Sequence, residues 1–362
     1  MSMPVWFETA FDELMQMGEQ LPHALLLHGQ RGIGKRELAV ALAQSLLCEA
    51  RLSNQQACRQ CASCTWFRQG NHPDFRLVQP AWVNVNEPML QPIGLVDGDD
   101  GTEGEGADSD ATGKKTKTLS REIRIEQVRG LMDWISMGNH RGGVKVMVFY
   151  PAEAMNPHAA NALLKTLEEP PPATHFILVT HRLDSLLPTI RSRCRLLGLP
   201  TPNQQQAMQW LQQQGLPEPA KALSYHGGAP LAAWFASQEP HRSEADKFSQ
   251  LQAALASPEQ MSALALAELL QKSPLNLVIA ALQRWIYDII SLSSSTMIRY
   301  HPEQQAVLAK LVSRLGAKGT AQRELLAYAA QLNDAQRLAQ HPLSAKLVLE
   351  SLCLTYQRLF TS

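Results

Sequence analysis

The 362-residue sequence has no net charge, few aromatic residues and no long uninterrupted hydrophobic run. Its 33 Lys and Arg residues balance its 33 Asp and Glu residues, which excludes a strongly basic protein that coats nucleic acid. Any contact with DNA must therefore come from a local patch or through partner proteins. Aromatic residues make up only 6% of the chain, but hydrophobic residues reach 45%, enough for two or three domains that each bury a core.

The sequence also lacks a segment that is typical of membrane insertion or secretion. The most hydrophobic run, 277–292, is interrupted by Gln283, Arg284 and Asp288, which would be costly in a bilayer. The N-terminal 22 residues carry four acidic residues within their apolar pattern, which argues against a secretory signal. These features predict a cytoplasmic protein with no membrane association.

Cysteine is scarce, but four of the six cysteines are clustered in a C-x9-C-x2-C-x2-C pattern: Cys48, Cys58, Cys61 and Cys64. Three thiols spaced by two residues, with a fourth at the end of a predicted helix, can converge on one tetrahedral Zn²⁺. Four sulfur ligands leave no open coordination position, so the predicted zinc element at about 48–64 has a structural metal. Buried free thiols are the alternative, and they are the expectation for the isolated Cys194 and Cys353.

From Ala24 to about Leu199, short β-rich runs alternate with helical patterns, which predicts an α/β domain with a parallel sheet covered by helices. Strands are expected at 24–28, 75–79, 145–150, 175–180 and 195–199. Helices are expected after Gly34, over 125–135 and after Asn156, whose side chain can cap the helix that Pro157 begins.

Beyond Leu199 the β signals fade and the pattern becomes helical. Two or three short helices are expected between 201 and about 242, and longer helices from there to Ser362. Ser257-Pro258 and Ser273-Pro274 each resemble a helix cap followed by a proline in the first turn.

Residues 97–118 differ in composition from the rest of the α/β region. They contain seven carboxylates in their first fourteen positions and no large apolar residue. Such a segment cannot offset the entropy that folding would cost, so we expect a disordered acidic loop inserted at the surface.

The glycine-rich segment GQRGIGKR, residues 29–36, resembles a phosphate-binding loop. Gly29, Gly34 and Lys35 occupy the positions that phosphate binding requires, after a predicted strand and before a predicted helix. Arg36 replaces the Ser or Thr whose hydroxyl binds Mg²⁺, and a cation there supplies no oxygen ligand. The loop is expected to bind an anion at most, and ATP binding by it is doubtful. A glycine turn without any ligand is the alternative.

The strand expected at 145–150 lacks the acidic residues that a P-loop ATPase needs at its end. Tyr150 and Pro151 stand where an Asp-Glu pair is expected, and the nearest carboxylate, Glu153, is displaced by two or more residues. Because phosphoryl transfer depends on metal positioning and on charge neutralisation, this defect and Arg36 together predict that the chain does not hydrolyse ATP.

Several segments taken together resemble a known family. They are HALLLHGQRGIGKRELAVALAQSLLC, the cysteine cluster, GNHPDF (70–75), IEQVRGL (125–131), NALLKTLEEPP (161–171) and TIRSRC (189–194). This set is similar to the δ′ branch of the AAA+ clamp-loader family of bacterial DNA polymerase III. The similarity is strongest over about residues 1–200.

The resemblance implies three domains and a set of partners. The domains are a RecA-like AAA+ domain at 1–199 with the inserted zinc element, a helical lid at 200–242 and a helical collar at 243–362 that joins subunits into a ring. The implied partners are the γ/τ and δ subunits of a hetero-oligomeric clamp loader and, through that complex, the sliding clamp and primed DNA.

The resemblance also assigns a role to Arg193 in the SRC motif, 192–194. It implies an arginine finger that acts in trans on ATP bound by an adjacent γ or τ subunit. From the sequence alone, a surface arginine near a helix C-terminus is the other explanation. Leu231, in the lid, stands where ATPase relatives have a nucleotide-sensing arginine. The expected function is that of a non-hydrolysing clamp-loader subunit.

Two other functions are alternatives to this expectation. An active ATPase of the γ/τ type would share NALLKTLEEPP, but the missing hydroxyl and acidic pair argue against it. A zinc-ribbon nucleic-acid-binding protein would share the cysteine cluster. The zero net charge and the lack of interleaved aromatic and basic residues near the cysteines argue against that function.

Overall fold

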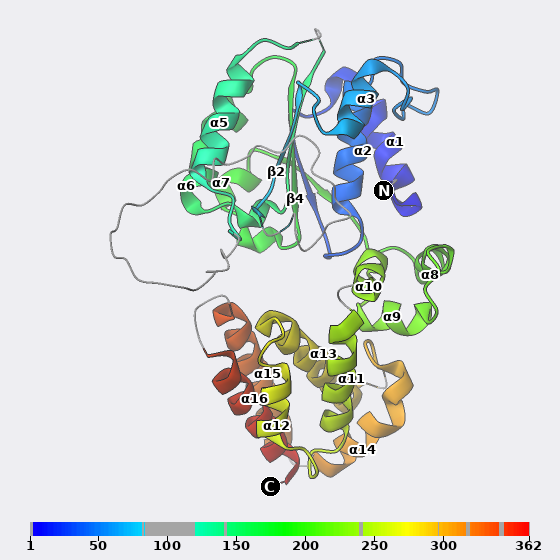
Figure 1. Cartoon of the computed structure of the whole chain (residues 1–362), viewed down its shortest axis with the longest axis vertical. Helices are drawn as coiled ribbons and strands as arrows, with labels where there is room; N and C mark the ends of the chain where they lie inside the picture. The colour runs from blue at the N-terminus through cyan, green and yellow to red at the C-terminus, as the bar shows by residue number, and fades with distance from the viewer. Residues whose placement is uncertain are drawn as a thin grey trace, which may run out of the picture. The chain divides into compact units, whose positions relative to one another are not determined.

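The computed structural model describes residues 3–81, 83, 120–140, 143–238, 242–295, 297–315, 319–339 and 344–361. The chain divides into two compact units, Met1–Pro202 and Asn203–Ser362, and Figure 1 shows the path of the chain through both. The acidic loop expected at 97–118 lies outside the described residues.

The first unit is built on a five-stranded parallel sheet. In chain order the strands are β1 (Ala24–His28), β2 (Phe75–Val78), β3 (Lys145–Phe149), β4 (Thr174–Thr180) and β5 (Arg195–Gly198). Across the sheet their order is β2-β3-β4-β1-β5. Leu26 of β1 is in register with Leu178 of β4 and with Leu196 of β5. The predicted parallel sheet is confirmed, and every strand agrees with its predicted range to within one residue at each end.

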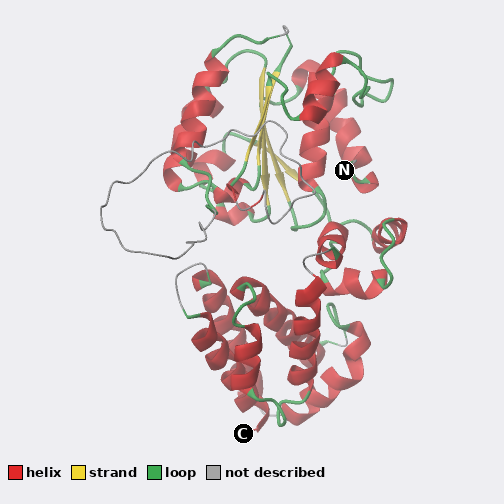
Figure 2. Cartoon of the chain, in the orientation of Figure 1, coloured by secondary structure: helices red, strands yellow, loops and turns green. Residues whose placement is uncertain are grey.

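Helices cover both faces of the sheet. Figure 1 shows α1 (Glu8–Gln16), α2 (Lys35–Leu47) and α3 (Ala62–Gln69) on one side, and α5 (Ile125–Ser136), α6 (Pro157–Glu168) and α7 (Pro188–Arg191) on the other. Because side chains alternate along each strand, Leu26 and Leu178 pack with Leu131 and Leu163 on the α5–α6 face. Figure 2 shows the strands between these two helical layers.

Side chains provide hydrogen-bond partners for backbone groups at the ends of two of these helices. Asn156 caps α6 as predicted, and its Oδ1 accepts a hydrogen bond of 2.8 Å from the Ala159 N–H. The buried Lys145, at the start of β3, donates from Nζ to the carbonyl oxygens of Trp134, at 2.6 Å, and Met137. A cation at the C-terminal end of α5 offsets the partial negative charge of its last carbonyls, which explains why a charged residue can begin a buried strand.

The second unit is all helical and contains two cores. A small core joins α8 (Gln204–Gln213), α9 (Pro219–Tyr225) and α10 (Pro230–Ser237) around Leu211 and Trp234. The other helices share a larger core: α11 (Arg242–Ala256), α12 (Ala263–Leu270), α13 (Leu275–Ser294), α14 (Gln305–Leu315), α15 (Gly319–Leu338) and α16 (Ala345–Thr361).

The helix start predicted at Ser257-Pro258 was wrong, and the start predicted at Ser273-Pro274 was one residue too early. Residues 258–260 form a turn, and α12 begins at Ala263, capped by Ser262, whose Oγ accepts from the Ala265 N–H at 3.3 Å. Helix α13 begins at Leu275, so Pro274 is its N-cap residue and does not lie in its first turn. A serine and a proline fit a loop as well as a helix start, and α12 begins instead where Ser262 caps it and Ala263 is buried.

Helix α13 is long and apolar enough to cross a membrane by length and composition. Its residues Val278, Leu282 and Ile286 are instead buried in the larger core of the second unit. The same helix carries the buried carboxylate of Asp288. Helix α13 is therefore a core helix.

Asp288 is fully buried and organises the segment that follows α13. Its carboxylate accepts hydrogen bonds from the backbone N–H groups of Arg299 and His301, each at 2.9 Å, and from His301 Nδ1–H at 2.9 Å. The His301 ring packs edge-on against Trp285 and against Tyr225 of α9. Since Tyr225 ends a helix of the small core, this network connects the two cores of the second unit.

We expect Asp288→Ala to lower the free energy of unfolding by about 3 kcal/mol, because it leaves several buried N–H groups without an acceptor. Urea denaturation followed by circular dichroism measures the change. Asp334→Ala is the control, since Asp334 forms an exposed pair with Arg337 and its loss should change stability by less than about 0.5 kcal/mol. Equal effects of the two substitutions would contradict the importance of the Asp288 network.

Candidate functional site

The glycine-rich loop connects the end of β1 to the start of α2. Gly29 has φ 149°, and a Cβ added there would lie 2.5 Å from the carbonyl oxygen of Leu199, so only glycine fits. Gly34 has the left-handed conformation, with φ 96° and ψ 23°, directly before α2. Trp6 Nε1 donates a hydrogen bond of 2.8 Å to the carbonyl oxygen of Ile33. The loop thus lies close to the residue that follows β5 (Arg195–Gly198) and is hydrogen-bonded to the N-terminal segment.

Lys35 is bonded to the loop that carries it. Its Nζ donates to the carbonyl oxygens of Gly29 at 2.8 Å and Gln30 at 2.6 Å, and to Nδ1 of His181 at 2.9 Å. The side chain is only 2% exposed. An ammonium group has three N–H donors, so these three acceptors use all of them. Lys35 could reach a phosphate only if it gave up hydrogen bonds that it already has.

The protonation of Lys35 and His181 follows from their burial. Burial lowers the pKa of Lys35 to about 8, and the nearby Glu153 opposes this shift. Burial, and then the charge of Lys35, lower the pKa of His181 well below its ordinary value. His181 is therefore neutral near pH 7, and its Nδ1 accepts a hydrogen bond from the ammonium. Sequence reasoning missed His181, whose only signal is its position directly after β4.

The structure brings together the two residues that break the catalytic pattern. Arg36 is buried, and its guanidinium lies 5.6 Å from the centre of the Tyr150 ring. The Tyr150 ring in turn packs edge-on against His181, with ring centres 5.5 Å apart. The residues at the expected hydroxyl and acidic positions thus form a cation–π contact. Neither side chain of that contact is a carboxylate or an aliphatic hydroxyl of the kind that binds Mg²⁺.

Glu153, the displaced carboxylate, lies in a short 3₁₀ turn after β3, Ala152–Ala154. Its Oε1 accepts a hydrogen bond of 3.0 Å from the backbone N–H of His181. This contact ties the ends of β3 and β4 together. Glu153 therefore has a structural partner.

The four clustered cysteines converge in space. Their sulfur atoms all lie within 4.8 Å of one another. Cys48 Sγ lies 3.9 Å from Cys61 Sγ, and Cys58 Sγ lies 4.0 Å from Cys64 Sγ. A tetrahedral zinc with Zn–S bonds of about 2.3 Å requires sulfur separations of about 3.8 Å. The cluster could hold a metal ion, and its geometry fits zinc.

Local backbone geometry prepares these thiols as ligands. Cys48 follows the last residue of α2, and Cys61 caps the N-terminus of α3. Cys58 Sγ accepts hydrogen bonds from the N–H groups of Gln60 and Cys61, which lower the pKa of this thiol to about 6. Burial raises the pKa of Cys48 and Cys64. A divalent cation would favour the thiolate form of all four.

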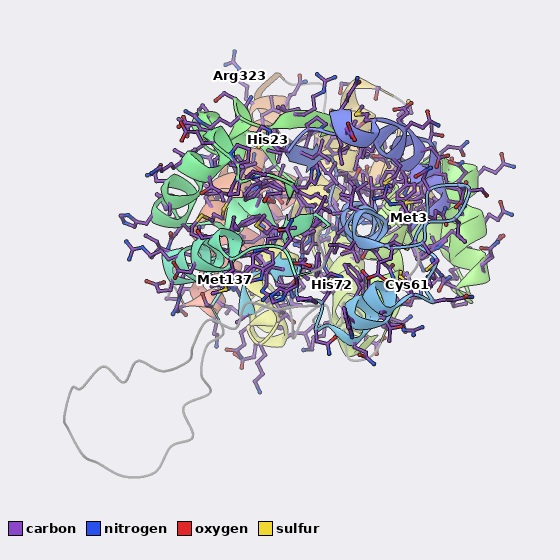
Figure 3. All side chains as sticks on the ribbon, turned by 90° about the horizontal axis from the view of Figure 1, so that it is seen from above. Met3, His23, Cys61, His72, Met137 and Arg323 are labelled. Atoms are coloured by element: carbon purple, nitrogen blue, oxygen red, sulfur yellow. The ribbon has the colours of Figure 1, made fainter. Side chains whose placement is uncertain are left out.

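The motif GNHPDF supports the cysteine cluster from the side of β2. Ser63 donates from Oγ to the Leu47 carbonyl at 2.6 Å, and the Asp74 N–H donates to His72 Nδ1 at 3.1 Å. The remaining contact, 2.8 Å between His72 Nε2 and Ser63 Oγ, must then use the histidine N–H as donor. All of these residues are buried, so this series of hydrogen bonds is structural. Figure 3 labels Cys61 and His72.

Arg193 lies just after α7, where its guanidinium has defined partners. Nε donates to Glu168 Oε1 at 2.7 Å, Nη2 also contacts Glu168 Oε1, and Nη1 donates to the Thr189 carbonyl at 2.7 Å. The arginine side chain is 29% exposed. The sequence identified Arg193 but not Glu168, the last residue of α6. The structure places Leu231 in α10 with 2% exposure, within the second unit.

Comparison with known proteins identifies the family. A family model described as "DNA polymerase III, delta subunit" matches residues 8–203. The chain is 36% identical over 218 residues to "DNA polymerase III subunit delta'" of Pseudomonas aeruginosa, covering 59% of this chain and 55% of the relative. It is 33% identical over 209 residues to the protein of that name from Escherichia coli (strain K12), covering 57% and 51%. The chain spans about half the length of the curated relatives it matches.

A γ subunit is also similar to part of this chain. "DNA polymerase III subunit gamma" of Buchnera aphidicola subsp. Schizaphis graminum is 30% identical over 175 residues, covering 48% of this chain and 37% of the relative. The crystal structure of a γ-subunit-related protein from Thermotoga maritima matches 96% of this chain and 98% of its own, with 16% identity and a TM-score of 0.42.

The family model covers more than half of the chain. Its range includes the glycine-rich loop, the four cysteines and Arg193. This chain therefore belongs to the DNA polymerase III delta subunit family and, by its relatives, to the δ′ clamp-loader subunits.

Proposed function

We propose that this protein is the non-hydrolysing δ′ subunit of a cytoplasmic clamp loader. It assembles with γ/τ and δ subunits, helps to load the sliding clamp on primed DNA, and supplies Arg193 to ATP bound by a neighbouring subunit. The observation that carries this proposal is the Lys35 ammonium bonded to its own loop, beside an Arg36–Tyr150 contact at the position of the metal ligands.

Loss of hydrolysis follows from what phosphoryl transfer requires. The reaction depends on Mg²⁺ bridging phosphate oxygens and on a group that orients the nucleophile. The guanidinium of Arg36 repels a divalent cation, and Tyr150 and Pro151 supply no carboxylate. Glu153 accepts a hydrogen bond from the backbone of His181. Catalysis is therefore opposed by charge repulsion at Arg36, by the missing carboxylate at Tyr150 and Pro151, and by the hydrogen bond that Glu153 already accepts.

The proposed role in trans rests on the position of Arg193. It lies between the buried Ile190 and Cys194, which fix the backbone on both sides, while its side chain stays partly exposed. A planar guanidinium can bind phosphate oxygens through two parallel N–H groups. Such a finger accelerates hydrolysis at its site by about 10³- to 10⁵-fold.

The cysteine cluster and the helical unit complete the proposal. Zn²⁺ bound by all four cysteines would join the end of α2 to α3 and have no open position, so its role is structural. The division into a domain at 1–199, a lid at 200–242 and a collar at 243–362 also remains part of the proposal. The separate small core of α8–α10 supports a lid distinct from the collar.

A γ-type ATPase is the second candidate, because a γ subunit is among the relatives. It would need Lys35 to leave its three acceptors and Arg36 to leave Tyr150. Even then no hydroxyl or acidic pair would be present for the metal. The arrangement around the loop therefore favours the δ′ role.

The purified chain should show no Mg²⁺-dependent ATP turnover, because the loop cannot position the metal. Steady-state phosphate release measures this, and Lys35→Ala should give the same background rate. A γ or τ subunit assayed in parallel provides the active control. Turnover by the isolated chain that Lys35→Ala abolishes would contradict the proposal.

Arg193→Ala should leave the complex with γ/τ and δ intact while it lowers ATP hydrolysis at the adjoining site by at least about a hundredfold. Size-exclusion chromatography measures assembly, and single-turnover kinetics measure hydrolysis. Arg195→Ala is the matched control, since Arg195 is an exposed arginine two residues away on β5. If Arg193→Ala prevented assembly, its role would be structural.

The protein should contain one Zn²⁺ per chain, and removal of the metal should lower the melting temperature of the first unit by roughly 10 °C. Metal analysis and thermal unfolding measure the two effects. Cys61→Ser should lose the metal, whereas Cys353→Ser, in the second unit, should retain it. Full metal content in Cys61→Ser would exclude the four-cysteine site.

A further inference from the structure

We propose that Glu168 is a positioning residue for Arg193. It binds the inner edge of the guanidinium, formed by Nε and Nη2, and so orients the outer edge toward an anionic oxygen of a neighbouring subunit's triphosphate. This inference rests on the proposed function, because it gives Arg193 the role of a finger. It adds a second residue to that role, from a different helix.

The hydrogen bonds of Arg193 indicate that Glu168 orients the guanidinium and does not merely neutralise its charge. A guanidinium has five N–H groups. Nε and one N–H of Nη2 point to Glu168 Oε1, and Nη1 donates to the Thr189 carbonyl, with Ser192 Oγ at 3.5 Å. The second N–H of Nη2 points to the outer edge, and no acceptor for it is found among the described residues. A donor at this edge is therefore left for a ligand, while the plane of the group is fixed on two sides.

Both ends of the Glu168–Arg193 pair come from well-packed segments. Glu168 is the last residue of α6, directly after the buried Leu167, and Pro170 follows two residues later. Arg193 is between the buried Ile190 and Cys194. Because the backbone at each end is already ordered, the contact restricts mainly the arginine side chain. Pre-organisation of this kind lowers the entropy lost when the group engages a transition state.

The exposure of the pair separates a positioning role from a stabilising one. The side chains of Arg193 and Glu168 are 29% and 48% exposed. Ion pairs this accessible contribute little to folding. Replacement of Glu168 should therefore leave the fold and the assembly unchanged, and its effect should appear in the reaction.

Glu169 provides a matched control for Glu168. It is the next residue, also a glutamate and also exposed, and no ion pair in the described part of the chain involves it. A general effect of negative charge near Arg193 would be changed by replacing either glutamate. A specific effect of the contact would be changed only by replacing Glu168.

The experiment uses complexes of the full chain with γ/τ and δ, each with one variant of this chain. The Arg193-dependent rate is defined as the ATPase rate of the wild-type complex minus that of the Arg193→Ala complex. We expect Glu168→Ala to reduce this rate about fivefold, the scale of one exposed ion pair, with an unchanged KM for ATP. Glu168→Gln, which keeps an oxygen acceptor, should retain most of the rate, and Glu169→Ala should retain all of it.

The double variant Glu168→Ala/Arg193→Ala provides the decisive comparison. If Glu168 acts through Arg193, its loss should add nothing once Arg193 is gone. A further decrease in the double variant would assign Glu168 to the structure and overturn the inference. An unchanged or raised rate in Glu168→Ala would also overturn it, because the contact would then be irrelevant or restraining. If Arg193→Ala itself had no effect, the proposed function would fail, and this inference with it.

Discussion

The contact between the Lys35 ammonium and the carbonyls of its own loop determines how the glycine-rich segment can act. A buried cation needs acceptors, and here the backbone of Gly29 and Gln30 and the neutral ring of His181 provide them. In a phosphate-binding loop the same positive charge would be directed to the ligand. Two carbonyl oxygens of the loop and the His181 ring therefore occupy the Lys35 donors that a phosphate would use. A nucleotide would have to compete with these three hydrogen bonds.

The Arg36–Tyr150 contact extends this arrangement to the metal position. In the sequence these residues lie 114 positions apart and look like two unrelated defects. In the fold they contact each other, since β3 and the start of α2 meet at the same edge of the sheet. Each residue stabilises the burial of the other. The aromatic face of Tyr150 stabilises the buried guanidinium of Arg36, and the guanidinium covers the buried ring. Replacing only one of the two residues with a metal ligand would break this contact without producing a complete metal site.

Much of the fold could be predicted from the sequence because it depends on local pattern. The five strands are short apolar runs between turn signals, and the Asn156 cap follows from a residue type at a fixed position. The cysteine cluster could be predicted because the spacing of its ligands is itself local. The Ser-Pro pairs misled because loops and helix starts share these residues. Helix α12 begins at the Ser262 cap instead, and α13 begins one residue after the predicted start.

The contacts that complete the site could not be predicted in the same way. His181 lies 146 residues from Lys35, and Glu168 lies 25 residues from Arg193. No periodicity or spacing connects such pairs, because they meet only after the sheet order has been set. The resemblance to a family identified Arg193 as a residue of interest but did not indicate what orients it. Sequence patterns thus found the individual groups, and the topology determined their partners.

Gly29 shows that the fold itself requires a residue of the nucleotide-binding motif. A side chain at this position would clash with the Leu199 carbonyl, which lies at the end of the neighbouring strand β5. Gly34 has a left-handed backbone that lets α2 begin at Lys35 and cover the sheet. Gly29 is therefore required by packing, and Gly34 is favoured by its backbone conformation. The presence of the motif is evidence for the fold of the loop, whereas hydrolysis depends on the oxygen ligands that Arg36 and Tyr150 replace.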